Sequence, residues 1–266
     1  MEREKLIKTI GWIGLILLLL LACSLLEMPI STPAPPTLTP IPSTSTPIPP
    51  TAAPASPTAN LQVEQASAFA DPILSIIANY SPHFEDDFST RNKGWETRIW
   101  FKPDIGSATI QDGVARLEVI DSIGAFDNEN INSKDFVLQL DVRFLEGDDT
   151  TTAVIIFHIS GEHHHFDVEL SSFNRRWVVR KLWGEGVQMD FVEGIASLTG
   201  KWMQIQIVAR RTQLAVYLDG KPIAYVEDAN FDNPGHTSLQ CQTITKAVCE
   251  FDNVRFWNLA KVSELP

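Results

Sequence analysis

The sequence has few cysteines and lacks the short motifs that mark several enzyme classes. Only three cysteines occur in 266 residues, and none of them belongs to a Cys-x-x-Cys pair. The chain also has no glycine-rich phosphate loop, no nucleophile elbow of the Gly-x-Ser-x-Gly type and no Ser, His and Asp in the order of a triad. These absences argue against hydrolase, kinase and redox activity.

Clusters of basic residues are missing as well. The formal net charge is -12 at pH 7, and the acidic residues are spread along the chain instead of gathered in a tail. No run of Lys and Arg is present to neutralise phosphates, which argues against nucleic acid as a partner. The sequence has no internal repeat, and this argues against a propeller.

Residues 1–22 have the order of a secretion signal: positive charges come first, and an apolar run from Ile10 to Leu21 follows. The run is too short and ends too abruptly for a membrane-spanning helix. It closes in Leu-Leu-Ala-Cys, which resembles the lipobox of bacterial lipoproteins. The resemblance implies that Cys23 is lipidated and becomes the first mature residue, anchored in the membrane and exposed outside the cytoplasm. The alternative is an uncleaved anchor helix, which leaves the rest of the chain on the same side.

Residues 23–60 are predicted to be a disordered linker rich in Pro and Thr. The stretch from Pro29 to Thr58 holds eleven of the seventeen prolines and no charged residue. Such a segment buries too little apolar surface to order itself and favours extended polyproline II. At roughly 3.1 Å per residue, it reaches on the order of 90 Å. The sequence therefore predicts a semi-rigid stalk between the anchor and the remaining residues.

The other two cysteines, Cys241 and Cys249, lie close together near the C-terminus. In an oxidising compartment such a pair forms a disulfide that stabilises by about 2–4 kcal/mol. A disulfide is favoured here over the alternative of two free buried thiols. Two cysteines without clustered histidines make a poor zinc site.

Alternating apolar and polar residues predict a single all-β domain over residues 84–258, preceded by a lead-in over 61–83 and followed by a tail over 259–266. Phe136 to Phe144 is one clear period-two run, and about twelve to fourteen strands are expected. Asp-Gly pairs predict tight hairpins. No long helical stretch interrupts these runs, so the strands must pair antiparallel in a two-sheet sandwich. In the lead-in, Asp71 and Pro72 predict the start of one short helix.

Several short motifs occur in a fixed order between Phe84 and Trp257. They are Phe84-Glu-Asp-Asp-Phe88-Ser, Gly94-Trp95, Gly200-Lys-Trp202, Tyr217-Leu-Asp-Gly-Lys-Pro-Ile223, Asp228 and Phe251-Asp-Asn-Val254. Their order resembles the concanavalin-like jelly roll, and more narrowly laminin-G-like and keto-disaccharide hydrolase-like domains of bacterial surface proteins. It implies two antiparallel sheets curved around a core, adjacent terminal strands and a concave face that often binds sugars.

The resemblance also implies a structural calcium ion near the chain ends. Asp86, Asp87 and Asp252 are the residues that would supply hard oxygen ligands there. The alternative is that these carboxylates cap turns or accept hydrogen bonds from backbone N–H groups. Melting with calcium and with a chelator distinguishes the two.

The run from His163 to Leu170 is unusual in its polar residues. As a strand it places His163, His165, Asp167 and Glu169 on one face. This face is interpreted as a solvated surface, a ligand-binding surface, or a catalytic or metal site. Asp167 and Glu169 are weak catalytic candidates, because the acid and nucleophile of laminarinase-like hydrolases occupy a Glu-x-Asp-x-Glu motif. Here His165 stands in the leading position, so the motif is incomplete.

Further polar positions suggest that other strands share a ligand-binding surface. These candidates are Gln139, Asp141, Arg143, Gln204 and Gln206, with Tyr217 as an aromatic that stacks on a sugar ring. Three functions stay open. The preferred one is a non-catalytic module that binds a glycan or cell-wall polysaccharide, by analogy of fold. The alternatives are a glycoside hydrolase-like enzyme of the keto-disaccharide or laminarinase-like type and a structural or sensory protein-interaction domain.

Overall fold

A computed structural model describes residues 57–90, 93–161, 164–171, 176–183, 187–195, 200–227 and 234–265. The chain divides into two compact units, residues 1–52 and 53–266, and every described residue belongs to the second. The predicted signal, Cys23 and most of the linker lie outside the described residues, and so does His163. Among the described helices, none has the length and apolar character needed to cross a membrane.

Within the described ranges, the second unit consists of one α-helix, a series of antiparallel strands and a final short 3-10 helix. The sequence expectation of twelve to fourteen strands agrees with the thirteen that the described ranges contain. Their bounds are α2 Pro57–Ile77, β1 Phe84–Asp86, β2 Glu96–Trp100, β3 Ser107–Gln111, β4 Val114–Asn128, β5 Phe136–Glu146, β6 Thr152–Gly161, β7 His164–Ser171, β8 Arg176–Trp183, β9 Val187–Ile195, β10 Met203–Arg210, β11 Gln213–Leu218, β12 Lys221–Val226, β13 His236–Asn258 and η2 Leu259–Lys261.

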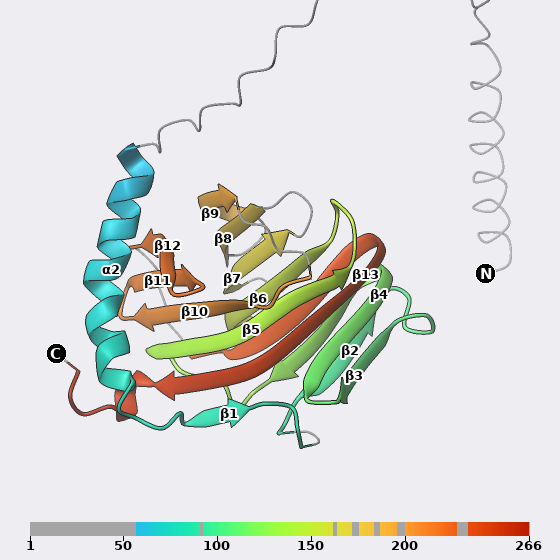
Figure 1. Cartoon of the computed structure of the whole chain (residues 1–266), viewed down its shortest axis with the longest axis horizontal. Helices are drawn as coiled ribbons and strands as arrows, with labels where there is room; N and C mark the ends of the chain where they lie inside the picture. The colour runs from blue at the N-terminus through green and yellow to red at the C-terminus, as the bar shows by residue number, and fades with distance from the viewer. Residues whose placement is uncertain are drawn as a thin grey trace, which may run out of the picture. The chain divides into compact units, whose positions relative to one another are not determined.

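The strands form two packed layers that share β13 and β4. One layer has the order β12-β11-β10-β5 and continues into residues 248–258 of β13. The other has the order β9-β8-β7-β6 and continues into residues 236–242 of β13. β4 follows β13 through both layers (Figure 1). The two-sheet antiparallel sandwich predicted from the sequence is therefore confirmed, and all its strands are joined by hydrogen bonds through β4 and β13.

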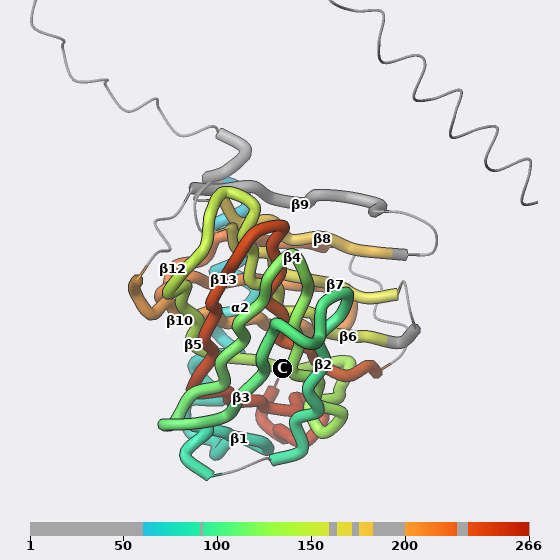
Figure 2. The backbone as a smooth tube through the Cα atoms, turned by 90° about the vertical axis from the view of Figure 1, so that its right-hand side faces the viewer, coloured from blue at the N-terminus to red at the C-terminus, as the bar shows by residue number. Residues whose placement is uncertain are grey.

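The main core lies between the two layers and follows the period-two alternation of the strands. In β5, Leu138, Leu140, Val142 and Phe144 are fully buried in it. The neighbouring strands β6, β7 and β8 pass side by side in the opposite layer (Figure 2). Because alternate side chains point to opposite faces, every strand also presents a second set of residues on the outer face of its layer.

The two predicted Asp-Gly hairpins are present. Asp112 and Gly113 join β3 to β4 with φ values of 54° and 76°. Asp219 and Gly220 join β11 to β12 with φ values of 49° and 71°. Positive φ at both central residues is the geometry of a type I′ turn, which matches the twist of the flanking strands.

The helix differs from the short helix expected at Asp71. α2 begins at Pro57, inside the stretch expected to be linker, and Pro72 lies in its interior. Its residues at helical spacing, Ala66, Ala70 and Ile73 among them, pack on the outer face of β10, β11 and β12. Burial of this apolar face outweighs the backbone hydrogen bond that proline removes. Figure 1 shows α2 along one side of the sandwich, away from β2 and β3.

A disulfide joins the two parts of β13. The predicted pair Cys241 and Cys249 is bonded, with a Cα–Cα distance of 5.8 Å. The pairing of β13 with β4 shifts register between Thr243 and Lys246, where β13 passes from one layer to the other. The disulfide therefore links the two layers beside the bend. Gly124 pairs with Cys241, and a larger residue would not fit there, because a Cβ would lie only 2.9 Å from Val119 Cγ1.

Candidate functional site

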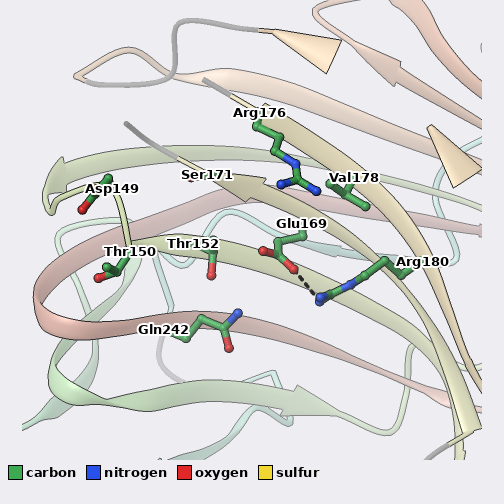
Figure 3. Close-up of a pocket in the computed structure, with 9 residues that line it drawn as sticks. All are labelled: Asp149, Thr150, Thr152, Glu169, Ser171, Arg176, Val178, Arg180 and Gln242. Atoms are coloured by element: carbon green, nitrogen blue, oxygen red, sulfur yellow. Dashed lines mark ion pairs between the residues drawn. The ribbon is translucent and has the colours of Figure 1, made fainter. Parts of the chain in front are cut away.

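A polar cavity of about 380 Å³ lies on the outer face of the layer that contains β6, β7 and β8. Figure 3 shows its lining side chains, which come from these strands, from β13 and from the loop before β6. The lining residues are Asp149, Thr150, Thr152, Glu169, Ser171, Arg176, Val178, Arg180 and Gln242. Hydrogen-bonding groups dominate this set, and none of its side chains is aromatic.

The alternation predicted for β7 is confirmed. Phe166, Val168 and Leu170 point into the main core, so His165, Asp167 and Glu169 lie on the outer face. A shift of one residue would turn the three apolar side chains of β7 out of the core. Their burial therefore fixes which face of the strand is polar. Of the four polar residues predicted to share the face, the structure brings these three together.

One guanidinium, that of Arg180, connects two of these carboxylates. Arg180 is the cross-strand neighbour of Asp167. Its Nε lies 3.0 Å from Asp167 Oδ1, and its Nη2 lies 3.3 Å from Asp167 Oδ2 and 2.5 Å from Glu169 Oε2. The Asp167 side chain is 2% exposed and that of Glu169 is 20% exposed. The His165 ring lies beside the Asp167 carboxylate, with Nε2 3.7 Å from Asp167 Oδ2.

The two carboxylates are held by the same cation. Acid–base hydrolysis by two carboxyl groups needs one proton donor and one ionised partner in different environments. Asp167 and Glu169 instead share one positively charged partner. Their oxygens accept charge-assisted hydrogen bonds from Arg180, which fix the side chains in place.

Several lining residues were not among the candidates from the sequence. Thr152, Ser171, Arg176 and Gln242 come from the ends of four different strand segments, and Asp149 comes from a loop. Their positions depend on the pairing of β6 with β7 and β13, which the sequence pattern does not give. Arg176 and Arg180 share a face of β8, and this spacing was the one available signal.

The predicted positions on β5 and β10 lie elsewhere. Gln139, Asp141 and Gln206 are on the outer face of the other layer, together with Arg143 and Gln204. The Gln206 amide donates to Gln139 Oε1 at 2.8 Å. Arg143 lies 4.4 Å above the Trp202 ring and pairs with buried Glu250. These positions and the polar residues of β7 therefore lie on opposite sides of the sandwich, because alternation fixes a residue's face without fixing its layer.

Tyr217 was predicted to stack on a sugar ring, and the structure corrects this. It is 3% exposed beneath α2, and its hydroxyl donates to Asp71 Oδ1 at 2.6 Å. Burial and the adjacent carboxylate raise the pKa of Tyr217 far above its ordinary value. Tyr217 therefore holds the helix on the sheet. The sequence could not show this, because the full length of α2 was not predicted.

The three candidate calcium ligands lie near one another at the β1 end of the sandwich. Asp86 accepts hydrogen bonds from the Phe88 backbone at 2.9 Å and from the Trp95 indole at 2.9 Å. Ser89 donates to Asp87, and this bonding lowers the pKa of Asp87. These contacts fit the turn-capping alternative. Within the described ranges, no three His, Cys, Asp or Glu side chains are grouped to hold a metal ion. Calcium binding stays a prediction that melting with calcium and with a chelator would check.

Solved structures share this fold at low sequence identity. A protein of unknown function with a galectin-like fold from Bacillus subtilis has a TM-score of 0.52, is 14% identical, and the match covers 67% of this chain and 96% of that one. A prokaryotic β-1,3-1,4-glucanase (lichenase) from a mouse hindgut metagenome has a TM-score of 0.53 at 12% identity, covering 66% and 99%. A LamA variant from Zobellia galactanivorans, in complex with laminaritriose and laminaritetraose, has a TM-score of 0.53 at 12% identity, covering 67% and 99%. These likenesses establish the fold as a concanavalin-like jelly roll.

A comparison with curated proteins finds no match to the chain. A family model does match, for the 3-keto-alpha-glucoside-1,2-lyase-like domain, over residues 83–257. The matched stretch begins just before β1 and ends one residue before the end of β13, so it contains the whole sandwich and leaves α2 outside. The fold, the order of its elements and the extent of this match together show that the chain belongs to the 3-keto-alpha-glucoside-1,2-lyase-like domain family.

Proposed function

We propose that the sandwich is a non-catalytic carbohydrate-binding module and that the cavity on β6, β7 and β8 is its binding site. The observation that carries the proposal is the Arg180 guanidinium shared by Asp167 and Glu169 at a cavity lined by hydroxyl, amide and charged groups. Such groups both donate and accept hydrogen bonds, as the hydroxyl groups of a sugar require. The occurrence of this fold in a glucanase and in a complex with laminari-oligosaccharides adds support by analogy.

The second candidate function is a sugar-processing enzyme, either a lyase or a hydrolase. Its support is the family name, which refers to cleavage of a 3-keto-alpha-glucoside. The outer face of β7 also has His165 beside Asp167, a pair that is able to move a proton. Against it stand the shared guanidinium and the incomplete laminarinase-like motif, in which His165 takes the place of the leading Glu.

We also propose that the module is displayed outside the cell, anchored by lipid on Cys23 and raised by the linker that precedes α2, residues 23–56. The support comes from the sequence alone. Growth with an alkyne-bearing fatty acid, followed by fluorescent tagging, should label the full chain and leave a Cys23→Ala variant unlabelled. Equal labelling of both chains would remove the lipid anchor.

Calorimetric titration of the full chain in detergent micelles with oligosaccharides tests the binding proposal. Glu169→Gln should weaken binding by about 1–3 kcal/mol, because it removes a charged acceptor and leaves partner groups unpaired. Gln204→Ala, on the outer face of the other layer, is the matched control and should bind as the unaltered chain does. An assay for sugar released from glycosides and 3-keto-glucosides is run in parallel. Turnover that Asp167→Asn abolishes would replace the proposal with the enzyme function.

A further inference from the structure

Two hydroxyl side chains of the cavity come from adjacent strands. Thr152 on β6 and Ser171 on β7 are cross-strand partners, 7% and 6% exposed. Both residues line the cavity. Within the part of the chain that the structure describes, neither Thr152 Oγ1 nor Ser171 Oγ has a hydrogen-bond partner.

Buried hydroxyl groups elsewhere in the sandwich do have partners. Thr237 Oγ1, on a residue 3% exposed, donates to the Ile131 carbonyl at 3.3 Å. Thr151 Oγ1, next to Thr152 in the chain, lies 3.4 Å from Thr243 Oγ1. A buried hydroxyl without a partner destabilises a fold, and such groups are usually satisfied. Two of them side by side in one cavity therefore point to a bound partner outside the protein chain.

The surrounding groups indicate the chemistry of that partner. Glu169 and Asp149 contribute two negative charges to the lining, and Arg176 and Arg180 contribute two positive charges. The described residues of the lining therefore carry no net charge, and Asp167 behind Arg180 adds a negative one, which favours a neutral ligand over an anionic one. Among the described residues of the lining, no side chain is aromatic, so the contacts that these residues offer are hydrogen bonds.

The size of the cavity limits the ligand further. A volume of about 380 Å³ lies near the lower end of the range of roughly 300–1,000 Å³ for ligand pockets. Cross-strand neighbours have Cβ atoms only about 4.5–5.5 Å apart, so both hydroxyl groups reach the same small ligand. One or two sugar rings fit this description better than the middle of a long polysaccharide chain.

We infer that Thr152 and Ser171 determine the specificity of the cavity by binding adjacent hydroxyl groups of a neutral sugar at the end of a glycan chain. This inference rests on the proposed carbohydrate-binding function. It goes beyond that function in naming the two contacts, the neutral charge of the ligand and its restriction to a chain end.

The test compares variants that lack one or both hydroxyl groups. Thr152→Val and Ser171→Ala remove them with little change of shape, singly and together in the full chain in detergent micelles. The probes are glucose, galactose, mannose, N-acetylglucosamine, glucuronic acid, laminaribiose and laminaritetraose, measured by calorimetry. We expect each variant to lose affinity for the bound neutral sugar by about tenfold or more. We expect the melting temperature to stay equal or rise, because an unpaired buried hydroxyl is removed. Laminaritetraose should bind no more tightly than laminaribiose if these glucans are ligands.

Thr237→Val is the matched control, since it removes a buried hydroxyl that has a partner. It should lower the melting temperature and leave the affinity unchanged. Variants at Thr152 and Ser171 that bind with unaltered affinity would overturn the inference, while a loss of binding in Glu169→Gln would still support the proposed function. Tighter binding of glucuronic acid than of every neutral sugar would also overturn it. If the unaltered chain binds none of the sugars or longer glycans, both proposals are wrong.

Discussion

At the scale of single residues, Asp167 is a nearly buried carboxylate that depends on a charge from the next strand. Arg180 supplies that charge through two contacts of 3.0 and 3.3 Å. Removing one partner of a buried ion pair leaves a desolvated charge and costs about 3–5 kcal/mol. Arg180→Met keeps the apolar stem, and the Arg180 side chain is 25% exposed, so we expect a loss of about 3 kcal/mol. Urea unfolding measures it.

The control for this prediction is an ion pair on the surface. Arg98 lies 3.2 Å from Asp127, but its side chain is 56% exposed. Arg98→Met should change the free energy of unfolding by no more than about 1 kcal/mol. Adding Asp167→Asn to Arg180→Met should restore part of the lost stability, because it removes the negative charge that Arg180 no longer balances. No recovery in the double variant would contradict the electrostatic explanation.

The ionised Asp252 carboxylate lowers the stability of the fold, so this residue makes the protein less stable as pH rises. Burial, followed by repulsion from Asp141, Asp87 and Asp86, raises the pKa of the Asp252 carboxyl in the folded protein. A raised pKa means that the protonated carboxyl favours folding below the unfolded-state pKa. This contribution disappears as pH rises through the folded-state pKa. Asp252→Asn, which stays neutral, should therefore be more stable at pH 7 by roughly 0.5 kcal/mol, with no difference at pH 3.

The comparison variant for Asp252 is Asp87→Asn. Hydrogen bonds from Ser89 lower the pKa of Asp87, so its ionised form favours folding. Asp87→Asn should lower the stability at pH 7, and the loss should vanish as pH falls. Unfolding in urea at several pH values measures both variants. Equal pH dependence in the two variants would show that neither carboxyl contributes as described.

The sequence correctly predicted which face of a strand a residue occupies, because that depends only on the alternation of side chains. The faces of Asp167, Glu169 and Phe166 follow from period two, and the structure confirms them. Alternation does not say which strands become neighbours. For that reason the sequence did not place Gln139 in the layer opposite β7, and Thr152 was missed as a residue of the cavity.

At the scale of elements, α2 is an addition to the family's sandwich, held by apolar contacts. Ile73 is 2% exposed against the sheet, and it lies outside the residues that the family model matches. Ile73→Asp places a charge in this contact and should release the helix. We expect amide hydrogens of residues 61–77 to exchange faster, while those of β10 in the sandwich stay protected.

The control variant lies on the exposed face of the same helix. Leu61 is 55% exposed, so Leu61→Asp should leave exchange unchanged apart from the end of the helix. Loss of protection in β10 as well would show that α2 and the sandwich unfold as one unit. The length of α2 could not be predicted from the sequence, because Pro72 signals a helix start in isolation and only packing on the sheet explains its interior position.

At the scale of the whole sandwich, the sequence was enough to predict two antiparallel sheets, their turns and the pairing of Cys241 with Cys249. It was not enough to predict that β4 and β13 pass through both layers, since this depends on a local shift of register near Thr243. The bend creates a place where the layers approach each other. The disulfide lies there and restricts their separation.

The double variant Cys241→Ala and Cys249→Ala tests the role of this link. The disulfide closes a short loop, with a sequence separation of 8, so the chain-entropy model predicts a loss of about 2–3 kcal/mol on its removal. Reductant should lower the free energy of unfolding of the unaltered chain in urea by a similar amount and leave that of the double variant unaffected, which controls for other effects of the reductant. If the double variant were as stable as the unaltered chain, the pairing of β13 with β4 would alone hold the bend. In the expected case, the covalent link keeps the two layers in a fixed relation at the bend, next to Gln242, which lines the cavity.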